Sequence, residues 1–206
     1  MLTGKDKIST MKIIGITGGV GAGKTQVLSY IAAHWPCRII KADEAAHFLY
    51  QPGQACFEKI VDLLGSKILN NEGTIDRSKM AAAIFGNSIL LEKVNQIVHP
   101  EVKKYIIEQI EQERQKKVVT YFFIEAALLI EEQYDRIVDE LWYIYADEDV
   151  RRKRLTQSRH YSEDKIAAIM KKQRSEEEFR KSCQVVIMNN EDLEETYRQI
   201  DRFLEL

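Results

Sequence analysis

The sequence predicts an α/β fold in which a parallel β-sheet is flanked by helices. Short apolar runs suited to buried strands recur along the chain, and amphipathic helical patterns separate them. This alternation is typical of βαβ units, whose strands lie parallel. The expected strands are Lys12–Thr17, Arg38–Lys41, Val118–Ile124, Glu140–Tyr145 and Gln184–Met188. A closing helix is indicated by apolar residues at spacings of four, three and three: Leu193, Tyr197, Ile200 and Phe203.

A glycine-rich octapeptide joins the first expected strand to the first expected helix, Gln26–His34. Residues 18–25 are G-G-V-G-A-G-K-T, which fits the pattern G-x-x-x-x-G-K-[ST]. A strand, a glycine loop and a helix in this order let backbone N–H groups surround a phosphate, and the helix N-terminus adds partial positive charge. The chain is therefore expected to have a P-loop NTPase fold and to bind a nucleoside triphosphate.

The motif assigns a role to each loop position. Lys24 is expected to reach the β- and γ-phosphates, and the Thr25 hydroxyl is expected to bind Mg²⁺. The predicted nucleotide-binding residues of the loop are Gly19, Val20, Gly21, Ala22, Gly23, Lys24, Thr25 and Gln26. The N-K-x-D element of guanine-specific proteins does not follow a later strand. A small-molecule kinase that uses a nucleoside triphosphate and Mg²⁺ is the class that best fits these features.

The segment between the second and third expected strands is far longer than one crossover helix requires. Asp76 is a plausible N-cap, and Pro100 suits a first helical turn. We expect helices at Glu44–Tyr50, Gln54–Leu64, Arg77–Phe85, Ser88–Val98 and Pro100–Lys117. This segment is interpreted as a helical insertion that binds the substrate.

A second helical segment, Val150–Lys181, lies between the last two expected strands. Lys and Arg outnumber Asp and Glu in it, although the whole chain carries a net charge of −2. A basic helical pair at this place is typical of a lid that clamps phosphates, although a solvated helix face has the same composition. Arginine's planar fork suits phosphate oxygens, and the segment offers Arg151, Arg152, Arg154 and Arg159.

Two carboxylates follow or close expected strands, at the edge where open α/β sheets bind ligands. Asp43 comes just after the second strand, where it can accept a hydroxyl proton or orient Mg²⁺, and it can also cap a helix that begins near Glu44. Glu125 ends the third apolar run, where a carboxylate can reach Mg²⁺ through water or can simply end the strand.

Composition excludes several other classes. The net charge of −2 gives no reason to propose nucleic-acid or membrane binding, and no apolar run approaches a membrane span. Three widely spaced cysteines without a C-x-x-C pair favour free thiols and the cytoplasm. Residues 1–10 are polar and are interpreted as a leader or as an upstream start, because Met11 directly precedes the first strand.

Taken in order, several motifs resemble the dephospho-coenzyme A kinases, over residues 11–206. The resemblance includes I-G-I-T-G-G-V-G-A-G-K-T at 14–25, A-D-E-A-A-H at 42–47, G-T-I-D-R at 73–77 and H-P at 99–100. It continues with A-L-L-I-E at 127–131, R-L at 154–155, Gln173 and V-I-M-N at 186–189.

The resemblance implies ATP-dependent phosphorylation of the ribose 3′-hydroxyl of dephospho-coenzyme A. Asp43 then corresponds to the family's proposed general base, and Lys24, Arg154 and Arg159 are the other expected catalytic residues. Arg77, His99 and Glu131 fall on positions associated with the acceptor or its surroundings. Asn189 lies on the stretch expected near the adenine, and Thr25 and Glu125 are the expected metal ligands.

The resemblance also implies three functional parts. These are a nucleotide-binding core at 11–44, 116–149 and 182–206, an acceptor domain at 45–115 and a lid at 150–181. The other functions considered are a nucleoside or nucleotide kinase, whose acceptor site would lie in the same insertion, and a nucleotide-sensing module without phosphotransfer.

The chain departs from the family's usual pattern at several positions. Lys41 replaces the first aspartate of the D-A-D segment, so any metal role of that carboxylate is lost or supplied elsewhere. Glu125 replaces an aspartate, Ala127 a proline, and Gln184 a common aspartate. Ser158 stands where an arginine is frequent, with Arg159 one residue later.

Overall fold

The computed structural model describes residues 11–190 and 192–205, and these divide into two compact units. The first unit comprises residues 11–39 and 113–205 of the described chain, and the second comprises Ile40–Gln112. Across 11–190 and 192–205, no helix combines the length and the apolar character needed to cross a membrane.

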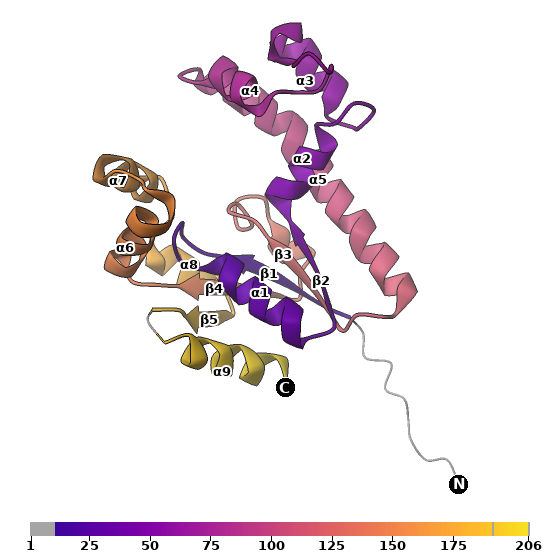
Figure 1. Ribbon diagram of the computed structural model, residues 1–206. Coiled ribbons are helices and arrows are strands. Elements are labelled where there is room, and N and C mark those ends of the chain that lie inside the picture. Colours follow the sequence, from indigo (N-terminus) through magenta and orange to yellow (C-terminus); the bar gives the residue numbers. More distant parts are fainter. Residues whose placement is uncertain (1–10, 191, 206) are drawn as a thin grey trace. The chain divides into compact units, whose positions relative to one another are not determined.

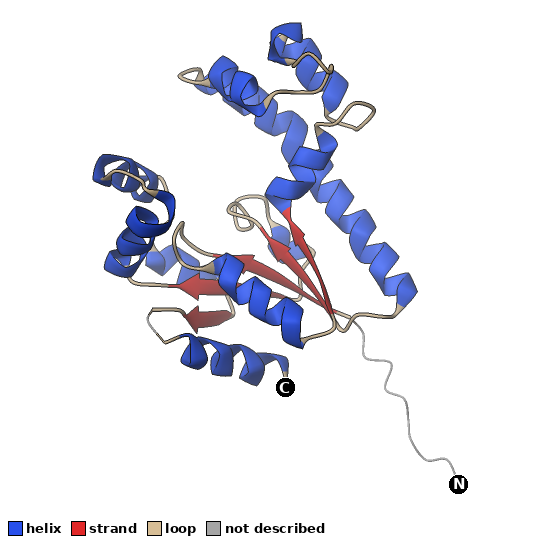
Figure 2. Ribbon diagram, viewed as in Figure 1, coloured by secondary structure: helices blue, strands red, loops and turns tan. Residues whose placement is uncertain are grey.

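A five-stranded parallel sheet organises the first unit, in the order β2-β3-β1-β4-β5 (Figure 2). Its strands are β1 Lys12–Thr17, β2 Cys37–Lys41, β3 Tyr121–Glu125, β4 Glu140–Tyr145 and β5 Val185–Met188. The predicted parallel α/β fold is therefore confirmed, and β1 and β4 have the predicted bounds. Strand β2 continues from the first unit into the second.

Two helices cover one face of this sheet, α1 Lys24–His34 and α9 Leu193–Leu204 (Figure 1). Ile31 of α1 and Ile200 of α9 join a core with Ile14, Trp142 and Ile144 of the strands. Tyr197 and Phe203 pack against the same core, which confirms the predicted apolar face of the last helix.

The opposite face of β4 carries the alternate side chains, as the pleat of a strand requires. Tyr143 stacks on Phe179 of helix α8 there, with ring centroids 4.7 Å apart. The predicted pair of helices between the last two strands is wrong in number, because three are present. They are α6 Glu148–Arg159, α7 Glu163–Lys171 and α8 Glu176–Ser182.

The second unit consists mainly of helices. It contains α2 Ala42–Leu49, α3 Phe57–Leu64, the 3₁₀ turn Ser66–Ile68, α4 Arg77–Ile84 and most of α5 Ser88–Lys116. The other 3₁₀ turn, Tyr134–Arg136, belongs to the first unit. Asp76 caps α4 as predicted, since its carboxylate accepts from the amides of Ser78 and Lys79.

The predicted break at Pro100 is wrong, because α5 runs through it without interruption. Proline lacks an N–H and therefore loses one helical bond, which is why the sequence favours a break. Pro100 itself is exposed, and buried residues recur every four positions on both sides of it. These residues are Val94, Val98, Val102, Ile106 and Ile110. Their continuous packing outweighs the lost bond, since tertiary contacts supply most helix stability.

Several predicted element starts also change, among them those of β3, α2 and α3. Strand β3 begins at Tyr121 and not at Val118, because Lys117 has a left-handed φ of 54° and Val118 is 74% exposed. Helix α2 begins at Ala42, so its N-cap is Lys41 and Asp43 lies in the first turn. Helix α3 begins at Phe57, since Gln54 lies in the preceding turn.

Candidate active site

The glycine-rich loop leads from the end of β1 into the first turn of α1. Gly23 is the N-cap of α1 and has a left-handed φ of 89°, a conformation that glycine adopts without steric cost. Within the described helix α1, the first turn contains no acidic side chain. Its amides lack intrahelical partners and its dipole is positive at this end, so the loop is suited to bind an anion.

The ammonium of Lys24 lies against the start of the loop. Its Nζ donates to the backbone carbonyl of Gly18 at 2.7 Å and to that of Gly19 at 3.4 Å. The side chains of Thr25 and Gln26 are exposed in the first helical turn. The structure therefore brings the predicted phosphate-binding residues together on one short stretch of backbone.

Asn189 supports this loop from the interior of the first unit. Its side-chain amide donates to the carbonyl of Ala22 at 2.7 Å, and its Oδ1 accepts from the Thr196 hydroxyl at 3.2 Å. The residue is only 1% exposed. Both polar ends of the side chain are thus bonded within the protein, so Asn189 can influence a nucleotide through the position of the loop.

The predicted lid arginines differ in their surroundings. The guanidinium of Arg154 donates to the carbonyls of Asn189 at 2.9 Å and Asn190 at 2.5 Å, and burial lowers its pKa. Arg159 is the last residue of α6 and is exposed. Arg154 therefore braces the chain after β5, next to the loop, whereas Arg159 lies at the helix end.

Arg151, unlike Arg154 and Arg159, donates a hydrogen bond to the loop itself. The sequence alone did not distinguish Arg151 from the neighbouring arginines. Nε of Arg151 donates to the carbonyl of Val20 at 3.0 Å, and Nη2 donates to Oε1 of Gln173 at 2.5 Å. The available signal was its spacing from Leu155, which is 1% exposed and lies one turn later on α6. Residues four apart share a helix face, so Arg151 follows the buried side of α6.

The residues present fit a magnesium ion that is held mainly by phosphate oxygens. Glu125 ends β3 and lies opposite Ile16 of β1, one residue before Thr17 and the loop. In the described part of the chain, the buried Thr17 hydroxyl has no hydrogen-bond partner. No group of three His, Cys, Asp or Glu side chains within 11–190 and 192–205 can hold a metal. Mg²⁺ commonly uses one or two carboxylates, water and substrate phosphates, so the Thr25 hydroxyl and the Glu125 carboxylate are donors of a kind that it accepts.

In the second unit, Asp43 and Arg77 lie near one phenol. Burial raises the pKa of Tyr50 to about 12, and of the nearby charges Arg77 opposes this rise while Asp43 adds to it. The first turn of α2 and the start of α4 thus both act electrostatically on Tyr50. Sequence reasoning missed Tyr50, because only the folded insertion shows that it is their neighbour.

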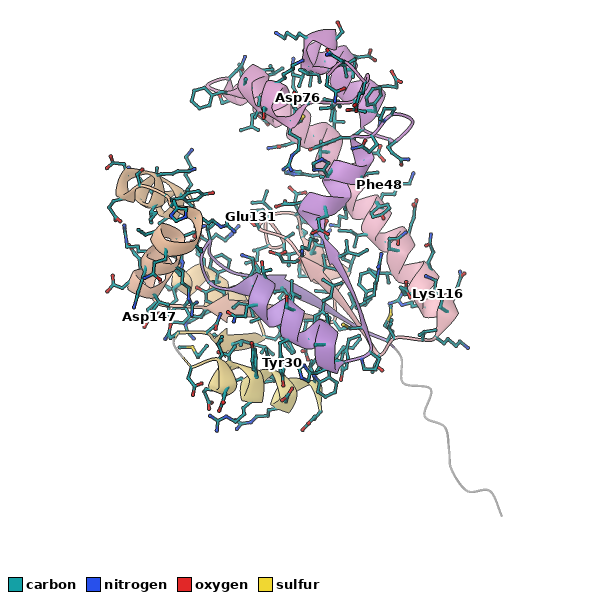
Figure 3. All side chains as sticks on the ribbon, in the orientation of Figure 1. Tyr30, Phe48, Asp76, Lys116, Glu131 and Asp147 are labelled. Atoms are coloured by element: carbon teal, nitrogen blue, oxygen red, sulfur yellow. The ribbon has the colours of Figure 1, made fainter. Side chains whose placement is uncertain are left out.

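The other two predicted acceptor residues belong to different units. His99 lies partly buried in the middle of α5, in the second unit. Glu131, labelled in Figure 3, follows β3 in the first unit. Its Oε1 accepts a hydrogen bond from Nε of Arg174 at 2.5 Å. Lys41, which stands at the family's usual aspartate, donates to Glu44 at 2.8 Å.

The parallel sheet and the loop between β1 and α1 define a protein of the P-loop NTPase class, as predicted. A family model described as dephospho-CoA kinase matches residues 12–195. A dephospho-CoA kinase from Carboxydothermus hydrogenoformans is 36% identical over 190 residues, which are 92% of this chain and 91% of that protein. The chain belongs to the dephospho-CoA kinase family, so the resemblance seen in the sequence is confirmed.

Solved structures agree with this fold. The protein TT1252 from Thermus thermophilus has a TM-score of 0.79 and 25% identity, over 95% of this chain and 97% of that one. A dephospho-CoA kinase from Campylobacter jejuni has a TM-score of 0.65 and 20% identity, over 95% and 97% of the two chains. At that identity the second likeness supports the fold alone.

Proposed function

We propose that this chain is an enzyme that transfers the γ-phosphoryl group of ATP to the ribose 3′-hydroxyl of dephospho-coenzyme A. The observation that carries the proposal is the family match over residues 12–195, in a chain whose phosphate-binding loop is intact. Phosphoryl transfer needs positioning, positive charge on the phosphates and a base for the acceptor, and the chain supplies a candidate for each.

The nucleotide side of the reaction is assigned to the first unit. Backbone amides of the loop hold the phosphates, and the Lys24 ammonium, held at 2.7 Å from the Gly18 carbonyl, turns to the β- and γ-phosphates. Thr25 and Glu125 would hold Mg²⁺, which supplies charge neutralisation between the phosphates when bound. Asn189 and Arg154 position the loop and the segment after β5.

The acceptor side is assigned to the helical insertion, at 45–115, with Asp43 as the general base that receives the hydroxyl proton. Support comes from the position of Asp43 in the first turn of α2 and from its electrostatic influence on Tyr50, which Arg77 also influences. His99 and Glu131 are proposed to contribute to the acceptor's surroundings. The α6–α8 segment, at 150–181, is proposed to act as the lid.

The cytoplasm is the proposed location. Cys37, Cys56 and Cys183 are all free thiols, which suits a reducing compartment.

A coupled assay of ADP release tests the activity. ATP and Mg²⁺ are held constant while dephospho-coenzyme A is compared with adenosine and with nucleoside monophosphates. Strong turnover with dephospho-coenzyme A, and not with adenosine or nucleoside monophosphates, supports the proposal. Equal or better turnover of a nucleoside or nucleotide would make the chain a kinase of that acceptor, and nucleotide binding without any acceptor-stimulated turnover would indicate a sensing module.

A further inference from the structure

The guanidinium of Arg151 covers the first half of the phosphate-binding loop. Its Nε bonds the carbonyl of Val20 at 3.0 Å, and its plane lies directly over Gly19. A methyl group at Gly19 would lie 2.5 Å from Cζ of Arg151, closer than real contacts allow. Glycine at this position therefore makes room for the guanidinium.

Two cations share this stretch of backbone. Lys24 bonds the carbonyls of Gly18 and Gly19, and Arg151 bonds the next carbonyl, that of Val20. The lysine of such a loop reaches the β- and γ-phosphates. Because Arg151 bonds the adjoining carbonyl, we expect its charge to act on the same phosphates as that of Lys24.

Among residues 11–190 and 192–205, no carboxylate is hydrogen-bonded to Arg151 to balance its charge. Both of its hydrogen-bond acceptors are neutral, namely a backbone carbonyl and the side-chain amide of Gln173. Among the described residues, the acidic neighbour that influences it, Glu148, forms its ion pair with Arg152 at 2.7 Å. Burial lowers the pKa of Arg151, because a half-buried cation loses hydration that neutral partners replace only partly. Such a site favours an anion.

We infer that Arg151, held in place by Gln173, is the arginine of the α6–α8 segment that binds the γ-phosphate of the nucleotide. Its guanidinium has five N–H donors, and the two recorded bonds leave donors for phosphate oxygens. Gln173 is a positioning residue, because it acts through Arg151. Arg154 braces the segment after β5 through the carbonyls of Asn189 and Asn190, and Arg159 is exposed at the helix end, so neither occupies this position.

The inference rests on the proposed function only in that the nucleotide is ATP. Nucleotide affinity is therefore measured by calorimetry without an acceptor, using ATP and ADP with Mg²⁺, for wild type and Arg151→Gln. Arg151→Gln is expected to weaken ATP binding about 10-fold or more and to leave ADP binding within about twofold, because ADP lacks the γ-phosphate. Lys153→Gln is the control on the same helix, because it removes the same charge from an exposed position. Its affinities for ATP and for ADP should both stay within about twofold of wild type.

Gln173→Glu provides a second, independent variant. It keeps a hydrogen-bond acceptor for Arg151 but adds a carboxylate that neutralises the guanidinium. We expect a selective loss of ATP affinity with no loss of thermal stability, whereas a merely structural Gln173 would leave the ratio of ATP to ADP affinity unchanged. Equal losses for ATP and ADP in Arg151→Gln, or a wild-type ratio in Gln173→Glu, would overturn the inference.

Measurements of turnover separate this inference from the proposed function. If the proposed function holds, Arg151→Gln should also lower kcat on the order of 100-fold, as the loss of one preorganised hydrogen-bond donor does in other enzymes. If wild type binds ATP but does not phosphorylate dephospho-coenzyme A, the proposed acceptor is wrong and the affinity ratio still decides the role of Arg151.

Discussion

The side-chain amide of Asn189 donates a 2.7 Å hydrogen bond to the backbone carbonyl of Ala22, and this bond ties the end of β5 to the phosphate-binding loop. Asn189→Ala should therefore lower the free energy of unfolding by about 1–3 kcal/mol, because a buried carbonyl loses its donor. It should also raise KM for ATP, since the loop loses a support. Urea denaturation and steady-state kinetics measure the two effects.

Met188→Ala is the matched control for Asn189→Ala. Met188 precedes Asn189 and its side chain is 38% exposed, so the change in unfolding free energy should stay within about 0.5 kcal/mol. An Asn189→Ala protein that unfolds at the wild-type urea concentration, with unchanged KM for ATP, would contradict a supporting role.

Lys24→Ala tests the charge on the phosphates. The Lys24 ammonium donates to the loop carbonyls of Gly18 and Gly19, so its loss removes a cation directly from the phosphate-binding loop. We expect kcat to fall on the order of 100-fold or more, because a preorganised cation at the transferring phosphoryl group is removed. The coupled ADP-release assay measures this, and near-normal turnover would show that Lys24 does not act on the phosphates.

The parallel sheet and the loop were predictable from the sequence because both depend on local patterns. Apolar runs mark buried strands, and the G-x-x-x-x-G-K-[ST] spacing requires one backbone path. Strands β1 and β4 accordingly have their predicted bounds. The uninterrupted helix α5 was not predictable in this way. The local cost of Pro100 can be read from the sequence, but the packing of Val98 and Val102 that offsets it is tertiary.

The residues of the candidate site also divide into those that local sequence patterns predict and those that only the folded structure reveals. Lys24 and Thr25 follow from spacing alone, whereas Arg151 stands in a run of basic residues that look alike in one dimension. Only the fold shows that Arg151 bonds Val20 while Arg152 pairs with Glu148. Tyr50 was missed for the same reason, since its neighbours come from two different helices.

Asp43→Asn tests the general base. An amide keeps the size of the side chain but cannot receive the hydroxyl proton, so kcat should fall by about 10²–10⁴-fold while ATP affinity changes little. Single-turnover kinetics and calorimetry measure the two quantities. Glu44→Gln is the matched control, because Glu44 is the next residue and pairs with Lys41. A loss confined to ATP affinity would instead assign Asp43 to the nucleotide side.

The raised pKa of Tyr50 predicts how the stability of the protein changes at alkaline pH. Burial raises its pKa from 10.0 to about 12, so the folded protein keeps the phenol proton longer than the unfolded chain does. The stability contributed by Tyr50 is therefore fully present below the unfolded pKa and is lost as pH rises from about 10 toward 12. Tyr50→Phe has no proton to lose, so its stability should fall less steeply over this range.

Urea denaturation at a series of alkaline pH values measures this difference between wild type and Tyr50→Phe. The other tyrosines are common to both proteins, and their titrations cancel in the comparison. Parallel stability curves from pH 9 to 12 would mean that Tyr50 is not shielded from water as the insertion's packing implies.

Glu131 has two candidate roles, the ion pair with Arg174 and a contact to the acceptor. Its ion pair with Arg174 joins side chains that are 34% and 29% exposed, and such pairs contribute about 0.2–1 kcal/mol. If Glu131 also acts on the acceptor, Glu131→Gln should raise KM for dephospho-coenzyme A several-fold while the free energy of unfolding changes by less than about 1 kcal/mol. Arg174→Gln removes the same ion pair and leaves the carboxylate, so its KM should stay close to wild type. Equal rises in KM for the two variants would assign the effect to the ion pair, and Glu131 would then have no separate role in acceptor binding.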